Sequence, residues 1–211
     1  MMTRRGHLFV LSAPSGAGKS TLIDRAIREI PNMWHSISAT TRQPRDYEKE
    51  GVHYYFIERE AFQEKIEKDS FLEWAQVHGE FYGTPAAGVD NCLAEGKDVI
   101  MDLDVQGAIQ TMQRRPEAIT VFIMPPSIEV LRKRIEGRKS ESEESLKLRL
   151  LNAQKEMDQR GRYEHLIVND VFDDAYRELV AIIENTRKSG GENTRKSGGE
   201  NTRKSGGEGS A

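Results

Sequence analysis

The chain has 211 residues, a length that suits one compact domain with room for sub-lobes. Its 31 lysines and arginines nearly balance its 34 aspartates and glutamates, so no basic excess predicts nucleic-acid binding. The single cysteine, Cys92, excludes an intramolecular disulfide framework and fits a reducing compartment. No apolar stretch approaches the ~20 residues that a membrane span needs, and residues 1–16 do not resemble a signal peptide. We therefore expect a cytoplasmic protein without a membrane or nucleic-acid partner, and leave its oligomeric state open.

Four apolar runs predict strands. They cover residues 7–12, 98–104, 118–124 and 165–170. Each run is almost continuously apolar rather than alternating, which is typical of parallel strands that are covered on both faces.

Helical patterns separate these runs. They cover residues 19–29, 59–68, 105–114, 127–136, 141–159 and 173–187. Strands that alternate with helices predict an α/β fold, a three-layer sandwich with a central parallel sheet and right-handed crossovers.

Residues 34–84 break this alternation with short segments rich in serine, threonine, tyrosine and phenylalanine. Such segments predict a small β-rich lobe inserted into the sheet domain. We expect the lobe to span about 34–96 and the core to consist of 1–33 and 97–187.

The octapeptide ENTRKSGG occurs three times in tandem over residues 184–207, and no apolar residue follows Ile183 except the final alanine. A repeat this short and polar cannot build a solenoid core. We expect the first copy to finish the last helix and the low-complexity tail, 188–211, to be disordered.

The segment APSGAGKST, residues 13–21, follows the first predicted strand and opens the first predicted helix. Gly16 and Gly18 let the backbone curl, and the curl with the helix N-terminus forms a nest of N–H donors for an anion. Lys19 adds a positive charge, and the Ser20 hydroxyl can ligate Mg²⁺. This is the P-loop pattern, with Ala13 where the strict pattern has glycine. The residues expected to bind the phosphates of a nucleotide here are Ser15, Gly16, Ala17, Gly18, Lys19, Ser20 and Thr21.

Two carboxylates end the second predicted strand, in VIMDLD. A P-loop fold places a carboxylate near Mg²⁺ at such a strand end, and Asp102 fits that place. Asp104 lies on the same side of the strand end.

Arg42 and Arg45 lie three residues apart in SATTRQPR, where two guanidinium groups could clamp one phosphate. Taken alone, they could equally be solvated surface arginines. Tyr54 and Tyr82 offer further hydroxyl donors in the same lobe, although such tyrosines usually belong to a core.

Glu73, in FLEWAQV, adds base recognition. A carboxylate can accept both the N1–H and the N2–H of guanine, whereas adenine presents an unprotonated N1 and would be repelled. Ser38 and Thr84 could supply hydroxyls. Together with the arginine pair, these residues predict a guanosine monophosphate pocket.

With these residues in place, the chain resembles the guanylate kinases from its first predicted strand to about residue 186. The motifs that carry the resemblance are SAPSGAGKST, SATTRQPR, GVHYYF, FLEWAQVHGEFYGT, DLDVQG, PPS, RIEGR, RLLNAQKE and LIVND. The resemblance implies an ATP-dependent, Mg²⁺-requiring phosphorylation of GMP or dGMP to the diphosphate, within guanine nucleotide synthesis and recycling.

The resemblance also implies roles for individual residues. Lys19 would hold the ATP phosphates and Ser20 would reach Mg²⁺. Asp102 would contact the metal through water and would also belong to the GMP-binding residues. Guanine would be read by Ser38, Glu73, Thr84 and Asp104. The acceptor phosphate would be held by Arg42, Arg45, Tyr54 and Tyr82. Asn169 would lie near the adenine of ATP.

A helical lid over about 134–150 would carry three arginines that close over the transferring phosphate. They are Arg134, Arg138 and Arg149, which with Lys19 and Arg42 form the expected catalytic set. Lys139 stands where glycine is common in the family and could slow closure of the lid.

Three other readings compete. DVQG, residues 104–107, matches a short element of GTP-switch proteins, but the chain lacks their N-K-x-D motif. Guanylate-kinase-like scaffold domains bind peptides and have typically lost the loop and nucleotide contacts that this chain retains. A nucleoside monophosphate kinase with another acceptor is the third, and Glu73 argues against AMP.

Overall fold

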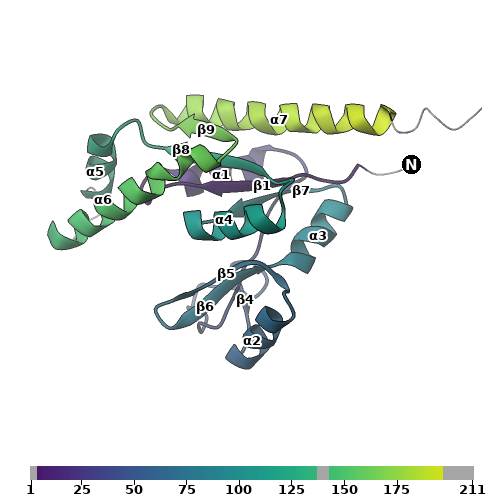
Figure 1. Cartoon of the computed structure of the whole chain (residues 1–211), viewed down its shortest axis with the longest axis horizontal. Coiled ribbons are helices and arrows are strands. Elements are labelled where there is room, and N and C mark those ends of the chain that lie inside the picture. The colour runs from purple at the N-terminus through teal and green to yellow at the C-terminus, as the bar shows by residue number, and fades with distance from the viewer. Residues whose placement is uncertain (1–3, 137–142, 197–211) are drawn as a thin grey trace, which may run out of the picture.

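The computed structural model describes residues 4–136 and 143–196, the last seven of them by their backbone alone. It consists of two sheets with helices around them (Figure 1). The central sheet has five parallel strands in the order β2-β7-β1-β8-β9, which confirms the predicted α/β class. The second sheet has the order β4-β3-β6-β5 and lies below the first in this view.

The strands of the central sheet are β1 (Leu8–Ser12), β2 (Met33–His35), β7 (Asp98–Asp102), β8 (Ile119–Met124) and β9 (His165–Val168). The second sheet contains β3 (Ala39–Thr40), β4 (Tyr55–Phe56), β5 (Phe71–Val77) and β6 (Glu80–Pro85). The helices are α1 (Lys19–Glu29), α2 (Arg59–Glu67), α3 (Ala86–Ala94), α4 (Val105–Arg114), α5 (Ile128–Glu136), α6 (Glu143–Asp158) and α7 (Phe172–Lys196), with a short 3₁₀ helix at Arg160–Arg162.

Both faces of the central sheet are buried, because successive side chains of a strand point to opposite faces. From β1, Phe9 and Leu11 pack into the cluster that contains α1 and α7, while Leu8 and Val10 pack into the cluster that contains α3 and α4. All four side chains are at most 3 % exposed. This two-sided burial explains why the strand sequences read as continuous apolar runs.

Two boundaries differ from the sequence prediction. The segment 33–35 pairs in parallel with β7, so Trp34 and His35 belong to the central sheet rather than to the inserted lobe. Likewise α3 packs on β7 and shares its apolar cluster. A three-residue edge strand with one buried side chain carries too little periodicity to be recognised in a sequence.

The last helix also runs further than predicted. The sequence predicts that it ends at residue 187, inside the first ENTRKSGG copy, but α7 continues to Lys196, within the second copy. The prediction of disorder is therefore wrong for residues 188–196, which are helical. A helix already nucleated and packed up to Ile183 needs only propagation, which costs little per residue even though each glycine costs about 1 kcal/mol. Among the helices described, none has the length and apolarity that a membrane span requires.

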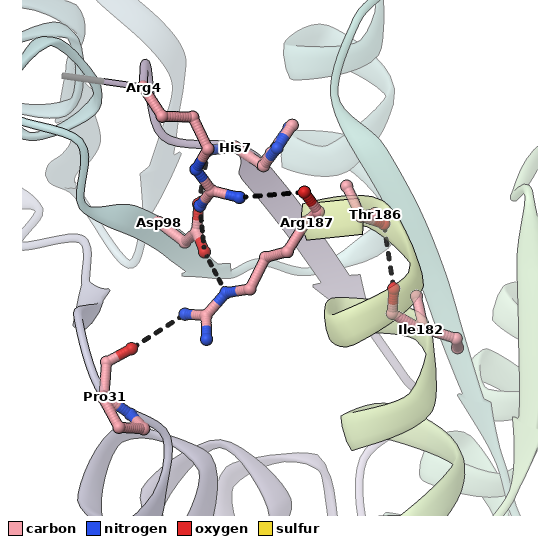
Figure 2. A network of polar contacts seen from close by, with 7 residues as sticks. All are labelled: Arg4, His7, Pro31, Asp98, Ile182, Thr186 and Arg187. Atoms are coloured by element: carbon pink, nitrogen blue, oxygen red, sulfur yellow. Dashed lines mark hydrogen bonds and ion pairs between the residues drawn. The ribbon is translucent and has the colours of Figure 1, made fainter. Parts of the chain in front are cut away.

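Asp98, at the start of β7, connects the two ends of the domain (Figure 2). Its side chain is fully buried, and it accepts hydrogen bonds from Arg4 at 2.8 Å, from Arg187 at 2.6 Å and from the backbone N–H of His7 at 2.7 Å. Arg187 also donates to the Pro31 carbonyl at 2.8 Å. One buried carboxylate therefore joins the N-terminal segment, the central sheet and α7.

We expect Asp98→Ala to lower the free energy of unfolding by about 3 kcal/mol, because it leaves two partly buried guanidinium groups and a backbone N–H without their acceptor. Urea denaturation measures this loss. Asp173→Ala is the control, since it removes an exposed partner of Arg25 and should change stability little. An Asp98→Ala protein as stable as the wild type would contradict this role.

Candidate active site

A loop with two left-handed glycines follows β1, where residues 13–18 turn into α1. Gly16 and Gly18 have φ angles of 93° and 92°, in the left-handed region that favours glycine, and Gly18 is the N-cap of α1. The loop lines a cavity together with Asp102, Asp104 and Glu156. The predicted curl and helix N-terminus therefore face a space that an anion can enter.

Lys19 lies at the floor of this cavity. Its ammonium nitrogen is 2.6 Å from Asp102 Oδ1 and also donates to the Leu103 carbonyl. The Ser20 hydroxyl donates to Asp102 Oδ2 at 3.3 Å. The structure thus brings the loop lysine and the loop serine to the strand-end carboxylate, which follows them by more than eighty residues in the sequence.

A hydroxyl and a carboxylate on one wall of an anion cavity fit Mg²⁺, which takes oxygen ligands and usually retains water and substrate phosphates. Ser20 Oγ and Asp102 Oδ2 are already within hydrogen-bond distance of each other. Among the described residues, no group of three or more histidine, cysteine, aspartate or glutamate side chains could hold a metal by itself. The donor set therefore suits an ion that phosphate oxygens help to bind.

Asn169 holds the loop from the end of β9. Its buried side-chain amide donates to the Ala17 carbonyl at 2.7 Å, and a Cβ on Gly18 would lie only 2.4 Å from its Nδ2. Arg134, on α5, donates to the Asn169 carbonyl at 2.9 Å. Asn169 and Arg134 also line a second hollow beside the loop, with Asp170 and Phe172 among its other residues.

Helix α6 approaches the loop from the other side. Arg149 donates to Ser15 Oγ at 2.8 Å, and Glu156, two turns further along the helix, lines the loop cavity. Burial, and then the nearby Asp104 carboxylate, raise the pKa of Glu156, while Lys19 and the Ser15 N–H oppose this shift. Helices α5 and α6 pack on each other through Leu131, Ile135, Leu146 and Ala153, so the described parts of the predicted lid form one unit.

In the inserted lobe, Arg42 and Arg45 gather around a third residue, Glu48. Arg42 forms a two-pronged ion pair with Glu48, at 2.8 and 3.0 Å, and the Arg45 backbone N–H donates to the same carboxylate at 2.7 Å. These bonds lower the pKa of Glu48 to about 2, and the pair raises the pKa of Arg42. The rings of Tyr54 and Tyr82 pack edge to face beside Arg42.

The four residues expected to read guanine are also brought together. Ser38 Oγ lies 3.1 Å from Thr84 Oγ1, and the Thr84 hydroxyl donates to Glu73 Oε1 at 2.7 Å. Asp104 caps α4 by accepting the Gly107 N–H at 2.8 Å, and a Cβ on Gly107 would lie 3.2 Å from Glu73 Oε2. Three lobe residues and the cap of a core helix therefore form one polar group.

Glu73 is the electrostatically unusual member of this group. It is 8 % exposed and has no cationic partner among the described residues. Burial raises the pKa of Glu73, the Thr84 hydrogen bond opposes this shift, and Asp104 adds to it. A buried carboxylate with a raised pKa and unused acceptor capacity is typical of a binding or catalytic site.

Glu48 and Glu156 are functional-site residues that the sequence did not predict. Glu48 could have been found by asking which carboxylate would neutralise two arginines spaced at three residues, because it lies three residues beyond Arg45. Glu156 lies seven residues after Arg149 and therefore on the same face of α6. Arg138 and Lys139, predicted for the lid, lie outside the described residues.

The chain matches the family model described as "Guanylate kinase" over residues 5–186. It is 45 % identical over 183 residues to a guanylate kinase of Desulfitobacterium hafniense, covering 87 % of this chain and 92 % of that protein. It is 46 % identical over 190 residues to a guanylate kinase of Shewanella sp., covering 90 % and 92 %. A crystal structure of guanylate kinase from Anaplasma phagocytophilum superposes with a TM-score of 0.65 and 31 % identity, covering 88 % of each chain.

We expect Glu73→Gln to raise the free energy of unfolding at pH 7. The native state raises the pKa of Glu73, so the protein loses stability as pH rises from 4.5 through that raised value, and a neutral amide avoids this loss. Below pH 4.5 Glu73 is protonated in both states and the advantage should vanish. Urea denaturation at pH 7 and at pH 4 measures the difference in free energy of unfolding between this variant and the wild type. Glu60→Gln, at an exposed position, is the control. A destabilised Glu73→Gln protein at pH 7 would refute this account.

Proposed function

This chain belongs to the guanylate kinase family, and we propose that it transfers the γ-phosphoryl group of ATP to GMP or dGMP, yielding ADP and the nucleoside diphosphate. The observation that carries the proposal is the buried Glu73 carboxylate beside Asp104, because Asp104 also lines the phosphate-loop cavity. One residue thus belongs both to the polar group suited to guanine and to the cavity suited to the ATP phosphates.

The acceptor base would bind in the plane of Glu73. Guanine presents N1–H and N2–H to one carboxylate, which as an anion only accepts hydrogen bonds, and the nearby hydroxyls of Ser38 and Thr84 can donate to O6. Adenine carries no proton on N1 and would leave the buried carboxylate without a donor there.

The acceptor phosphate would bind to Arg42, Arg45, Tyr54 and Tyr82. Glu48 accepts hydrogen bonds from Arg42 and keeps its guanidinium oriented, so Arg42 is not left unpaired before the phosphate binds. Bound phosphate would then accept from the remaining guanidinium N–H groups. This arrangement supports a clamp that is already formed before substrate binds.

The donor phosphates would bind in the nest of residues 15–21, with Lys19 moving from Asp102 to the phosphate oxygens. Mg²⁺, held by Ser20 and through water by Asp102, would neutralise charge on the phosphate oxygens when bound. No side-chain nucleophile is required, because a GMP phosphate oxygen attacks the γ-phosphorus in line. The protein positions both substrates and offsets negative charge.

Closure would complete the site. We propose that the lid, about residues 134–150, brings Arg134, Arg138 and Arg149 over the transferring group, and that the inserted lobe moves with bound GMP. Water would otherwise compete as acceptor, so exclusion of water should precede transfer. The hydrogen bond of Arg149 to Ser15 supports direct contact between the lid and the loop, and Arg134 contacts Asn169, which in turn bonds the loop at Ala17.

We place this reaction in the cytoplasm, in guanine nucleotide synthesis and recycling, without a nucleic-acid or membrane partner. The single buried thiol of Cys92 suits a reducing compartment. A non-catalytic binding module is the alternative function. The intact loop, with Lys19 and Ser20 gathered on Asp102, favours catalysis.

The proposal is tested by a coupled ADP-release assay with ATP, Mg²⁺ and, in turn, GMP, dGMP, AMP, CMP and UMP. We expect turnover with GMP and dGMP only. Folded protein that binds GMP without turnover would favour the binding module, and comparable turnover with AMP would overturn the guanine assignment of Glu73.

We expect Lys19→Ala to reduce kcat by about a thousandfold or more, because it removes a cation that lines the phosphate-loop cavity. The same assay at saturating ATP and GMP measures this loss. Lys65→Ala, an exposed lysine of α2, is the control and should leave kcat unchanged. A near-normal kcat for Lys19→Ala would exclude the assigned role.

A further inference from the structure

Strand β5 is an edge strand, because the second sheet ends with it and, within the part of the chain that the structure describes, it pairs only with β6. Its outer backbone groups therefore need partners from elsewhere. At Trp74 that partner is Gln110 of α4: the Trp74 N–H donates to Gln110 Oε1 at 3.2 Å, and Gln110 Nε2 donates to the Trp74 carbonyl at 3.1 Å. One side-chain amide thus takes the place of a peptide group in a neighbouring strand.

This contact adjoins Glu73 in the chain. The pairing of β5 with β6 changes register between Phe71 and Glu73, so the ladder is irregular where the carboxylate must be placed. On the other side of Glu73, α4 passes so close that a Cβ on Gly107 would lie 3.2 Å from Oε2. Helix α4 therefore meets β5 at two points, Gly107 and Gln110, which lie almost one turn apart.

We propose that Gln110 is a positioning residue for base recognition: it fixes β5 against α4 so that the Glu73 carboxylate lies beside Asp104, and it thereby sets the preference for a purine that carries a 2-amino group. The inference rests on the proposed function. Base recognition requires residues of the lobe and of the core to keep a fixed relative position. Gln110 links the two parts directly, through its hydrogen bonds to the backbone of Trp74.

The other polar link between α4 and the lobe is weaker. Arg114 pairs with Asp69, but the Asp69 side chain is 76 % exposed, and exposed ion pairs contribute little. The Gln110 amide makes both of its bonds in a partly buried setting, where loss of a partner leaves backbone groups unsatisfied. The position of the Glu73 carboxylate beside Asp104 should therefore depend on Gln110 rather than on Arg114.

Steady-state kinetics of Gln110→Ala with GMP and with inosine monophosphate, which lacks the 2-amino group, tests the inference. We expect kcat/KM for GMP to fall about tenfold, mainly through KM, as two hydrogen bonds are lost. The preference for GMP over inosine monophosphate should shrink, while the KM for ATP should not change. Gln113→Ala is the matched control, an exposed glutamine on the same helix, and should match the wild type.

Gln110→Glu provides a second variant, in case alanine prevents folding. It retains the shape and the acceptor for the Trp74 N–H but cannot donate to the Trp74 carbonyl, so the same loss of base preference is expected. If the wild type prefers GMP over inosine monophosphate and every Gln110 variant that folds keeps that preference, the inference is wrong. An equal fall in kcat/KM for both substrates, caused by kcat, would also overturn it, because that result indicates a merely structural role. A wild type without GMP turnover would instead refute the proposed function.

Discussion

The parallel register of β1 between β7 and β8 determines where the chemistry can be. Leu11 pairs with Asp102, and Ser12 pairs with Phe122, so the strands end along one edge of the sheet. The chain leaves β1 into the loop and returns with Lys19 to the level of Asp102. Because all these strands run in the same direction, groups far apart in sequence meet at their carboxyl ends, where ligands bind in open α/β sheets.

Helix α4 transmits this geometry to the inserted lobe. Its N-terminus follows β7 directly, so Asp104 both caps the helix and borders the phosphate cavity. Its first turn lies against Glu73 because Gly107 has no side chain. One rigid element thus relates the place where a base can be read to the place where phosphates can bind. Such a relation is what in-line transfer between two bound nucleotides requires.

The buried charges fall into two kinds. The buried Asp98 and the partly buried Glu48 each face arginines at hydrogen-bond distance, so their charges are compensated within the protein. Among the described residues Glu73 faces no cation: Thr84 supplies its hydroxyl at Oε1 and a backbone hydrogen bond, and burial still raises the pKa of Glu73. A carboxylate left so incompletely satisfied costs stability, and bound ligand donors can offset that cost. The contrast separates residues that hold the fold from the residue that awaits a partner.

Local signals in the sequence determined much of this. Continuous apolar runs predicted four strands of the central sheet, β1, β7, β8 and β9, and glycine spacing with Lys19 predicted the phosphate loop, since both depend on neighbours in the chain. Edge strand β2 and the extension of α7 were not determined locally, because pairing with β7 and propagation from a packed helix decide them. The same limit hid Glu48, Glu156 and Gln110. Their partners come from other elements, and only tertiary packing brings a glutamine of α4 to the backbone of Trp74.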